Sequence, residues 1–175
     1  DDPAMHSSQN EQDSRHYAMA SKIPMLEPSD SAECKEFTKL AYELSEEYDC
    51  PMFLRLSTRV SHSQSIVELE ERQNDELKEY KKDPAKYVMM PGNAIRRHPI
   101  VEQRTRDLIE FAETSDLNRV EMGDTFLGII TASTSYQYVK EVFGDKASVL
   151  KLGIANPLPE RLIRDFAAKV DRLVV

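Results

Sequence analysis

The sequence has few glycines, few cysteines and no long apolar run, and each shortage argues against a class of protein. Its five glycines form neither a GxGxxG nor a Walker motif, so no glycine-rich phosphate loop is expected. Its two cysteines, Cys34 and Cys50, make no disulfide framework and no CxxC metal pair. They fit a reducing compartment, and we expect the cytoplasm. No stretch approaches the roughly 18 consecutive apolar residues of a membrane-spanning helix, so no membrane partner is expected.

Basic residues are too few for a protein that binds nucleic acid. Lys and Arg number 23 against 31 Asp and Glu, a net charge of −8, whereas nucleic-acid binding needs a basic surface. The four histidines never stand four residues apart, and none neighbours a cysteine pair. We therefore expect no metal site in this chain.

Both ends of the chain are unusual for a complete domain. It opens on Asp1-Asp2-Pro3 without an initiator methionine or a signal-peptide pattern. It closes on Arg172-Leu173-Val174-Val175, an apolar run typical of a strand. We expect an internal piece of a longer protein that is not catalytic alone.

Charge and apolar pattern divide the chain at residues 66 and 98. Residues 1–66 predict a helix at 12–20, a strand at 22–28, a helix that begins at the capping box of Asp30 and Glu33, and a buried strand at 52–56. Helix followed by strand is half of a parallel α/β unit. The highly charged residues 67–98 predict a linker, either extended or a solvated helix.

Residues 99–175 alternate between strand and helix patterns. Helices are predicted at 99–114, at 135–143 with Ser135 as N-cap and Gly144 as the end, and after Pro159; strands are predicted at 126–131, 148–152 and 172–175. This order indicates a parallel βαβαβ sheet.

Residues 1–66 hold only two strands, which are marginal in water. We therefore expect their helix to pack on residues 99–175, or the chain to self-associate.

The run from Met5 to Arg15 has ten polar side chains among eleven residues. Such a run is usually a solvated loop. It could also leave the carboxyl edge of a parallel sheet, where α/β folds place their ligands. His6 could then exchange protons, and Arg15 could hold a carboxylate or fix the loop by pairing with Asp13 or another acid.

Arg96, Arg97 and His98 could bind an anion. The interpretation that we favour is that they belong to a linker that is hydrogen-bonded to its own domains.

Three segments resemble one family. His6-Ser7-Ser8-Gln9-Asn10-Glu11-Gln12-Asp13-Ser14-Arg15, followed by Lys22-Ile23-Pro24-Met25-Leu26-Glu27-Pro28-Ser29-Asp30, closely resembles the large (alpha) subunit of thiamine-diphosphate-dependent indolepyruvate ferredoxin oxidoreductases. The segments Leu54 to Ser63 and Gly128 to Pro159 agree with it, so the likeness spans essentially the whole chain. One departure is Thr131-Ala132-Ser133, where relatives have Thr-Ser-Gly.

The resemblance implies both fold and function. The fold would be the C-terminal half of a pyrimidine-binding domain (1–66), a linker (67–98) and a truncated transketolase C-terminal-like domain (99–175). The parent enzyme would decarboxylate arylpyruvates such as indolepyruvate oxidatively to aryl-acetyl-CoA. Its cofactors would be thiamine diphosphate, magnesium and [4Fe-4S] clusters, all with ligands outside this chain.

The resemblance also implies partners and site residues. The partners would be the beta subunit, a second alpha subunit, ferredoxin, a 2-oxo acid and coenzyme A. His6 would be catalytic, and Ser7, Gln9, Asn10 and Arg15 would belong to the loop beside substrate and cofactor. Two alternatives stay open: a segment at a subunit interface without substrate contact, and the same chemistry on pyruvate or 2-oxoglutarate.

Overall fold

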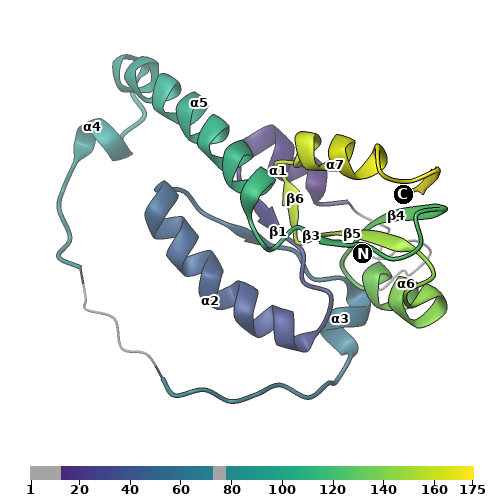
Figure 1. The fold of residues 1–175 in the computed structure, drawn as a ribbon. Helices are drawn as coiled ribbons and strands as arrows, with labels where there is room; N and C mark the ends of the chain where they lie inside the picture. The colour runs from purple at the N-terminus through teal and green to yellow at the C-terminus, as the bar shows by residue number, and fades with distance from the viewer. Residues whose placement is uncertain (1–12, 73–77) are drawn as a thin grey trace.

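The computed structural model describes residues 13–72 and 78–175, which form two β-sheets with helices packed around them (Figure 1). The helices are α1 Arg15–Ser21, α2 Ser31–Tyr48, α3 Thr58–His62, α4 Pro84–Tyr87, α5 Pro91–Thr114, α6 Ser135–Phe143 and α7 Glu160–Ala167. The strands are β1 Met25–Leu26, β2 Phe53–Leu54, β3 Arg119–Glu121, β4 Leu127–Ala132, β5 Ser148–Leu152, β6 Ile154–Asn156 and β7 Arg172–Val174. Among these residues no helix is both long and apolar enough to cross a bilayer.

The larger sheet has the strand order β3-β5-β4-β7. Strand β4 pairs in parallel with β5 and with β7, and helices α6 and α7 make the connections. The predicted parallel βαβαβ unit is therefore confirmed. The antiparallel edge strand β3 was not predicted, because three half-exposed residues carry too short a pattern.

The predicted α/β half-unit of residues 1–66 is also confirmed. The Asp30 side chain accepts a hydrogen bond from the Glu33 backbone N–H at 2.8 Å and so caps α2, whose Phe37 and Leu44 are buried. Strands β1 and β2, on either side of α2 in the sequence, pair in parallel. The predicted burial of the strand at 52–56 was wrong, since Phe53 is 37% exposed. It lies at the edge of the sheet β2-β1-β6, where no further described strand covers it.

A single residue, Gly153, separates β5 of one sheet from β6 of the other. Strand β6 pairs antiparallel with β1 and so ties residues 154–156 to the sheet of residues 1–66. The buried Asn118 fixes this crossing: its Oδ1 accepts from the backbone N–H of Gly153 and of Ile154, both at 3.0 Å. Its amide nitrogen donates to the Ala112 carbonyl at 2.8 Å.

One apolar core spans the two parts of the chain. Phe37 of α2 and Leu26 of β1 pack against Ala112 of α5 and Ile154 of β6. The expected packing of the N-terminal helix on the C-terminal residues is therefore confirmed.

Two local predictions were wrong. Helix α5 begins at Pro91 and not at Pro99, so Pro99 lies inside it. Proline disfavours a helix interior but suits the first helical position, which Pro91 occupies. Helix α6 has Thr134, not Ser135, as N-cap, and no side chain caps it. The residues 63–72 and 78–83 contain no helix or strand, whereas residues 84–87 and 91–98 of the predicted linker are helical.

Replacing Gly153 should weaken the crossing between the sheets. A Cβ there would stand 2.5 Å from the Leu117 carbonyl oxygen, a backbone atom that also accepts the Gly153 N–H. We expect Gly153→Ala to lower the free energy of unfolding by about 1–3 kcal/mol, measured by urea denaturation. Gly92→Ala is the matched control, because a Cβ at that helical position meets nothing within 4 Å. Equal stability of the two variants would contradict the expected clash of a side chain at position 153 with the Leu117 carbonyl oxygen.

Candidate functional site

The predicted polar loop is described only at its C-terminal end. His6, Ser7, Gln9 and Asn10 lie outside the described residues, and Arg15 is the one predicted site residue that the structure contains. It is the first residue of α1, and its backbone N–H donates to Asp13 Oδ1 at 2.9 Å.

The Arg15 guanidinium is held by a buried carboxylate. Its Nε and Nη2 donate to the two oxygens of Glu27 at 2.7 and 2.9 Å, and its Nη1 lies 3.5 Å from Asp13 Oδ2. Glu27 is fully buried, and Arg55 adds a longer contact at 3.4 Å. These contacts raise the pKa of Arg15, chiefly through the hydrogen bonds to Glu27. A bidentate pair of this kind fixes the orientation of a side chain and thereby the end of the loop.

Glu27 was not singled out in the sequence. The available signal was its position between Leu26 and Pro28, since an acid inside an apolar strand needs a cationic partner when it is buried.

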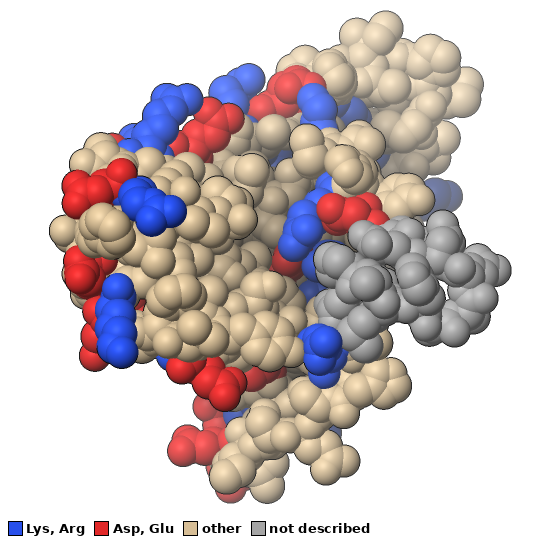
Figure 2. Space-filling view, turned by 90° about the vertical axis from the view of Figure 1, so that its right-hand side faces the viewer, with Lys and Arg blue, Asp and Glu red and all other residues tan. Residues whose placement is uncertain are grey.

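A cavity of about 850 Å³ lies beside Arg15. It opens at the carboxyl end of β4, where Thr131 and Ala132 are, and extends between α5 and α7. Its apolar lining consists mainly of Met19, Ile109, Ile130, Leu152, Leu158 and Val175. Figure 2 shows the end of the molecule that carries β7: uncharged residues cover its centre, and charged side chains lie around them.

The cationic side chains of the cavity already have acidic partners. Arg161 lies 2.9 Å from Glu110 and Arg164 lies 3.0 Å from Glu160, and Arg15 is paired with Glu27 as described above. Glu113 accepts the backbone N–H groups of Arg161 and Leu162 at the start of α7, both at 2.8 Å. These arginines are therefore not arranged to hold a diphosphate.

Within residues 13–72 and 78–175, no three His, Cys, Asp or Glu side chains are grouped as metal ligands. With the paired arginines, this means that the described residues do not fit the diphosphate, the magnesium ion or an iron–sulphur cluster.

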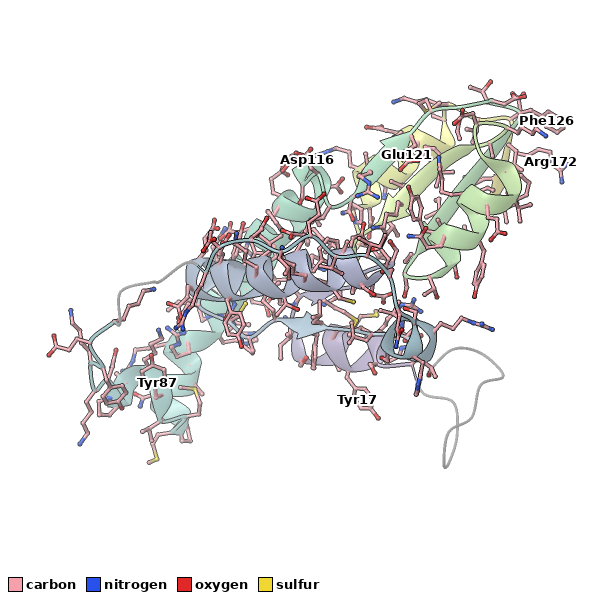
Figure 3. All side chains as sticks on the ribbon, turned by 90° about the horizontal axis from the view of Figure 1, so that it is seen from below. Tyr17, Tyr87, Asp116, Glu121, Phe126 and Arg172 are labelled. Atoms are coloured by element: carbon pink, nitrogen blue, oxygen red, sulfur yellow. The ribbon has the colours of Figure 1, made fainter. Side chains whose placement is uncertain are left out.

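A second charged cluster joins α2 to the larger sheet, the sheet that carries the labelled Glu121 and Arg172 in Figure 3. Lys151, the fourth of the five residues of β5, is fully buried and forms an ion pair with Glu33 in the first turn of α2. Its ammonium also lies over the rings of Phe37 and Tyr136, at 5.5 and 5.3 Å from their centroids. The sequence signal was a lysine inside an otherwise apolar strand pattern, and it was missed.

Glu33 forms ion pairs with two cations, Lys151 and Arg119. Arg119 of β3 stands opposite Lys151 in the strand register, and its guanidinium lies 3.3 Å from Glu33. The Ser29 backbone N–H and hydroxyl also donate to Glu33, at 2.8 and 2.9 Å. Burial alone would raise the pKa of Glu33, but Lys151 and the Ser29 donors together hold it below its ordinary value.

Arg96, Arg97 and His98 lie inside helix α5 and not in a linker, and each of them contacts a residue of the chain itself. Arg97 lies 3.6 Å from Asp49 at the end of α2, and His98 lies 3.3 Å from Glu102 of its own helix. Arg96 donates to the Asn93 side chain at 2.6 Å.

Comparison with known proteins gives consistent matches over the whole chain. It is 40% identical over 180 residues to indolepyruvate oxidoreductase subunit IorA of Archaeoglobus fulgidus. It is 41% identical over 181 residues to IorA of Methanothermobacter thermautotrophicus and 37% identical over 187 residues to IorA of Thermococcus kodakarensis. The whole chain is homologous to a segment of IorA. It spans 29% of the length of each of these relatives.

One solved structure has a similar fold. The structure resembles a 2-oxoglutarate:ferredoxin oxidoreductase from Magnetococcus marinus, solved with 2-oxoglutarate, coenzyme A and succinyl-CoA, with a TM-score of 0.54. The match covers 86% of this chain and 34% of that one at 15% identity. No family model matches the chain. The IorA likeness and this shared fold agree with the predicted transketolase C-terminal-like architecture.

The free energy of unfolding should fall by different amounts when Glu33 and Lys151 are replaced one at a time. Glu33→Gln leaves a buried ammonium without its counter-charge, and we expect a loss of about 3–5 kcal/mol in the free energy of unfolding. Lys151→Met should cost less, because Glu33 keeps Arg119 and Ser29 as partners. The double variant should be more stable than Glu33→Gln alone. Glu110→Gln, which removes an exposed pair with Arg161, is the control and should change stability little. Equal losses for both single variants would contradict the buried ion pair.

The stabilisation by Glu33 should disappear in acid. Its pKa is lower in the folded chain than the ordinary value of 4.5. The contribution is therefore complete above the unfolded pKa and is lost as the pH falls through the folded one. We expect the stability difference between the unsubstituted chain and Glu33→Gln to be constant near neutral pH and to shrink below about pH 4. Urea denaturation across this range measures it, and a difference that does not change with pH would refute the shift.

Proposed function

We propose that the chain is part of the large subunit of a thiamine-diphosphate-dependent enzyme that oxidises arylpyruvates such as indolepyruvate to aryl-acetyl-CoA. Ferredoxin would accept the electrons. The observation that carries the proposal is identity of about 40% to IorA subunits along the whole chain, with the fold of a 2-oxoacid:ferredoxin oxidoreductase in support. The beta subunit, a second large subunit and coenzyme A are the further partners in this proposal.

The role of the described residues is to hold the polar loop and the domains in place. The buried Glu27 fixes Arg15, and Arg15 begins the helix that follows the loop. In the proposal, His6 transfers a proton or donates a hydrogen bond to the 2-oxo acid, and Ser7, Gln9 and Asn10 lie beside it. Thiamine diphosphate, magnesium and the iron–sulphur clusters would be bound by parts of the enzyme outside this chain.

A purely structural role is the second candidate. The observation that favours it is that Arg15 is already paired with Glu27 and Asp13, as expected of a residue that fixes a loop. The two candidates differ in what they predict for His6.

The test is turnover in the intact enzyme assembly. With ferredoxin reduction by indolepyruvate as the assay, we expect His6→Ala to lower the rate about 10²–10⁴-fold, the usual size of an acid–base contribution. His16→Ala is the matched control, because His16 is exposed on α1 one residue after Arg15, and it should leave the rate unchanged. Gln9→Ala tests the neighbouring loop position in the same assay.

Arg15→Ala should lower both turnover and stability, because it leaves the buried Glu27 carboxylate without its bidentate partner. Thermal unfolding of the assembly measures the second effect. Turnover of His6→Ala equal to that of His16→Ala at saturating thiamine diphosphate would reject the catalytic role and support the structural one. Absence of any indolepyruvate oxidation by the unsubstituted assembly would reject the proposed substrate.

A further inference from the structure

Three exposed apolar side chains from separate parts of the chain line the cavity described above. Met19 of α1, Ile109 of α5 and Leu158, which precedes α7, are 64%, 41% and 50% exposed. Ile130 and Leu152 of the larger sheet also line it and are buried. The cavity thus combines a covered apolar wall with an open apolar rim, as in sites that bury the apolar part of a small molecule.

The volume and the position of the cavity suit a small ligand. About 850 Å³ lies within the usual range of ligand sites, roughly 300–1,000 Å³. The cavity opens at Thr131 and Ala132, the carboxyl end of the parallel strand β4, and α/β folds bind their ligands at such ends. Both features indicate a small-molecule site.

The arginines of the cavity favour an aromatic ligand over a phosphate. Arg15 donates from Nε and Nη2 to Glu27. Arg161 and Arg164 each donate from Nη2 to a glutamate. These bonds use the edges of the guanidinium groups, whereas aromatic rings stack on their planar faces. Met19 adds a sulphur atom, which also makes favourable contacts with aromatic rings.

Arg15 connects the cavity to the polar loop. It is the last residue of the run from Met5 to Arg15, it lines the cavity, and Glu27 fixes its orientation. In the proposed function this loop carries the groups that act on the 2-oxo acid. The oxo-acid end of an arylpyruvate would then lie on the loop side of Arg15, and its ring on the cavity side.

We propose that the cavity binds the aryl side chain of the arylpyruvate and so sets the preference of the enzyme for aromatic 2-oxo acids. The identity of the ligand rests on the proposed function. Met19, Ile109 and Leu158 would pack against the ring, and the faces of Arg161 and Arg164 would border it. These residues bind the ring and transfer neither protons nor electrons.

Binding of indole to the full 175-residue chain tests the cavity without turnover. The chain contains no tryptophan, so the fluorescence of indole can be followed without an indole signal from the protein. We expect saturable binding that Leu158→Asp weakens at least about tenfold, because the ring would then desolvate a carboxylate. Ile109→Ala is a milder second variant and should weaken binding in the same direction. Circular dichroism confirms that each variant is folded.

Val142→Asp is the matched control for both measurements. Val142 is 70% exposed on α6 and does not line the cavity. It introduces the same charge at an exposed apolar position, and it should leave indole binding and turnover unchanged.

Kinetics of the intact enzyme assembly test whether the cavity serves the substrate. With indolepyruvate, Leu158→Asp should raise KM at least about tenfold and leave kcat nearly unchanged, because the contact with the ring is the same in the ground state and in the transition state. A fall in kcat at unchanged KM would overturn the proposal, since it would show an effect on the reaction and not on binding of the ring.

The two measurements separate this site from the proposed function. If Leu158→Asp changes neither indole binding nor KM while the assembly oxidises indolepyruvate, the cavity is not the aryl site and the proposed function stands. If the unsubstituted assembly does not oxidise indolepyruvate, the proposed function fails, and the role of the cavity in that reaction is rejected with it. Binding of inorganic pyrophosphate in place of indole, lost in Arg161→Ala/Arg164→Ala, would identify an anion site and overturn the proposal.

Discussion

The buried ammonium of Lys151 is the constraint on which the arrangement of the two sheets depends. A lysine buried in a strand of the larger sheet needs a negative partner, and Arg119 beside it in the register adds a second positive charge. Glu33 can neutralise both positive charges because the Asp30 cap fixes the first turn of α2, where Glu33 lies. The helix is thereby held against the sheet, Phe37 enters the shared core, and the chain can cross at Gly153 from β5 to β6.

The same principle operates at the end of the polar loop. Glu27 is buried in the strand segment that follows α1, and it orients Arg15 through two hydrogen bonds. Both sites consist of a carboxylate from residues 1–66, buried for Glu27 and partly buried for Glu33, and one or more cations. Both fix geometry instead of presenting free charge. This explains how a cavity lined by several arginines can still be unsuited to a diphosphate.

Helix α4 and the first part of α5, residues 84–107, have no buried side chain and so lack a comparable constraint on their apolar side chains. Their polar contacts with the rest of the chain include Lys86 with Asp49 at 2.6 Å and Glu102 with Lys22, and these contacts leave apolar side chains such as Ile95 exposed.

Much of the fold could be predicted from the sequence, because β4, β5, α2 and α7 carry strong local patterns of apolar residues. Asp30 and Glu33 predicted the start of α2, and Gly144 the end of α6, since caps are local interactions. The segment from His6 to Asp30 predicted the likeness to the IorA relatives, whereas the roles of His6, Ser7, Gln9 and Asn10 stay predictions. The tertiary structure alone decided that β6 leaves its neighbour β5 and joins β1, that β3 pairs with β5, and that Glu33 meets Lys151 across 118 positions of sequence. Those choices depend on which distant groups must be neutralised or covered, and no local pattern contains that information.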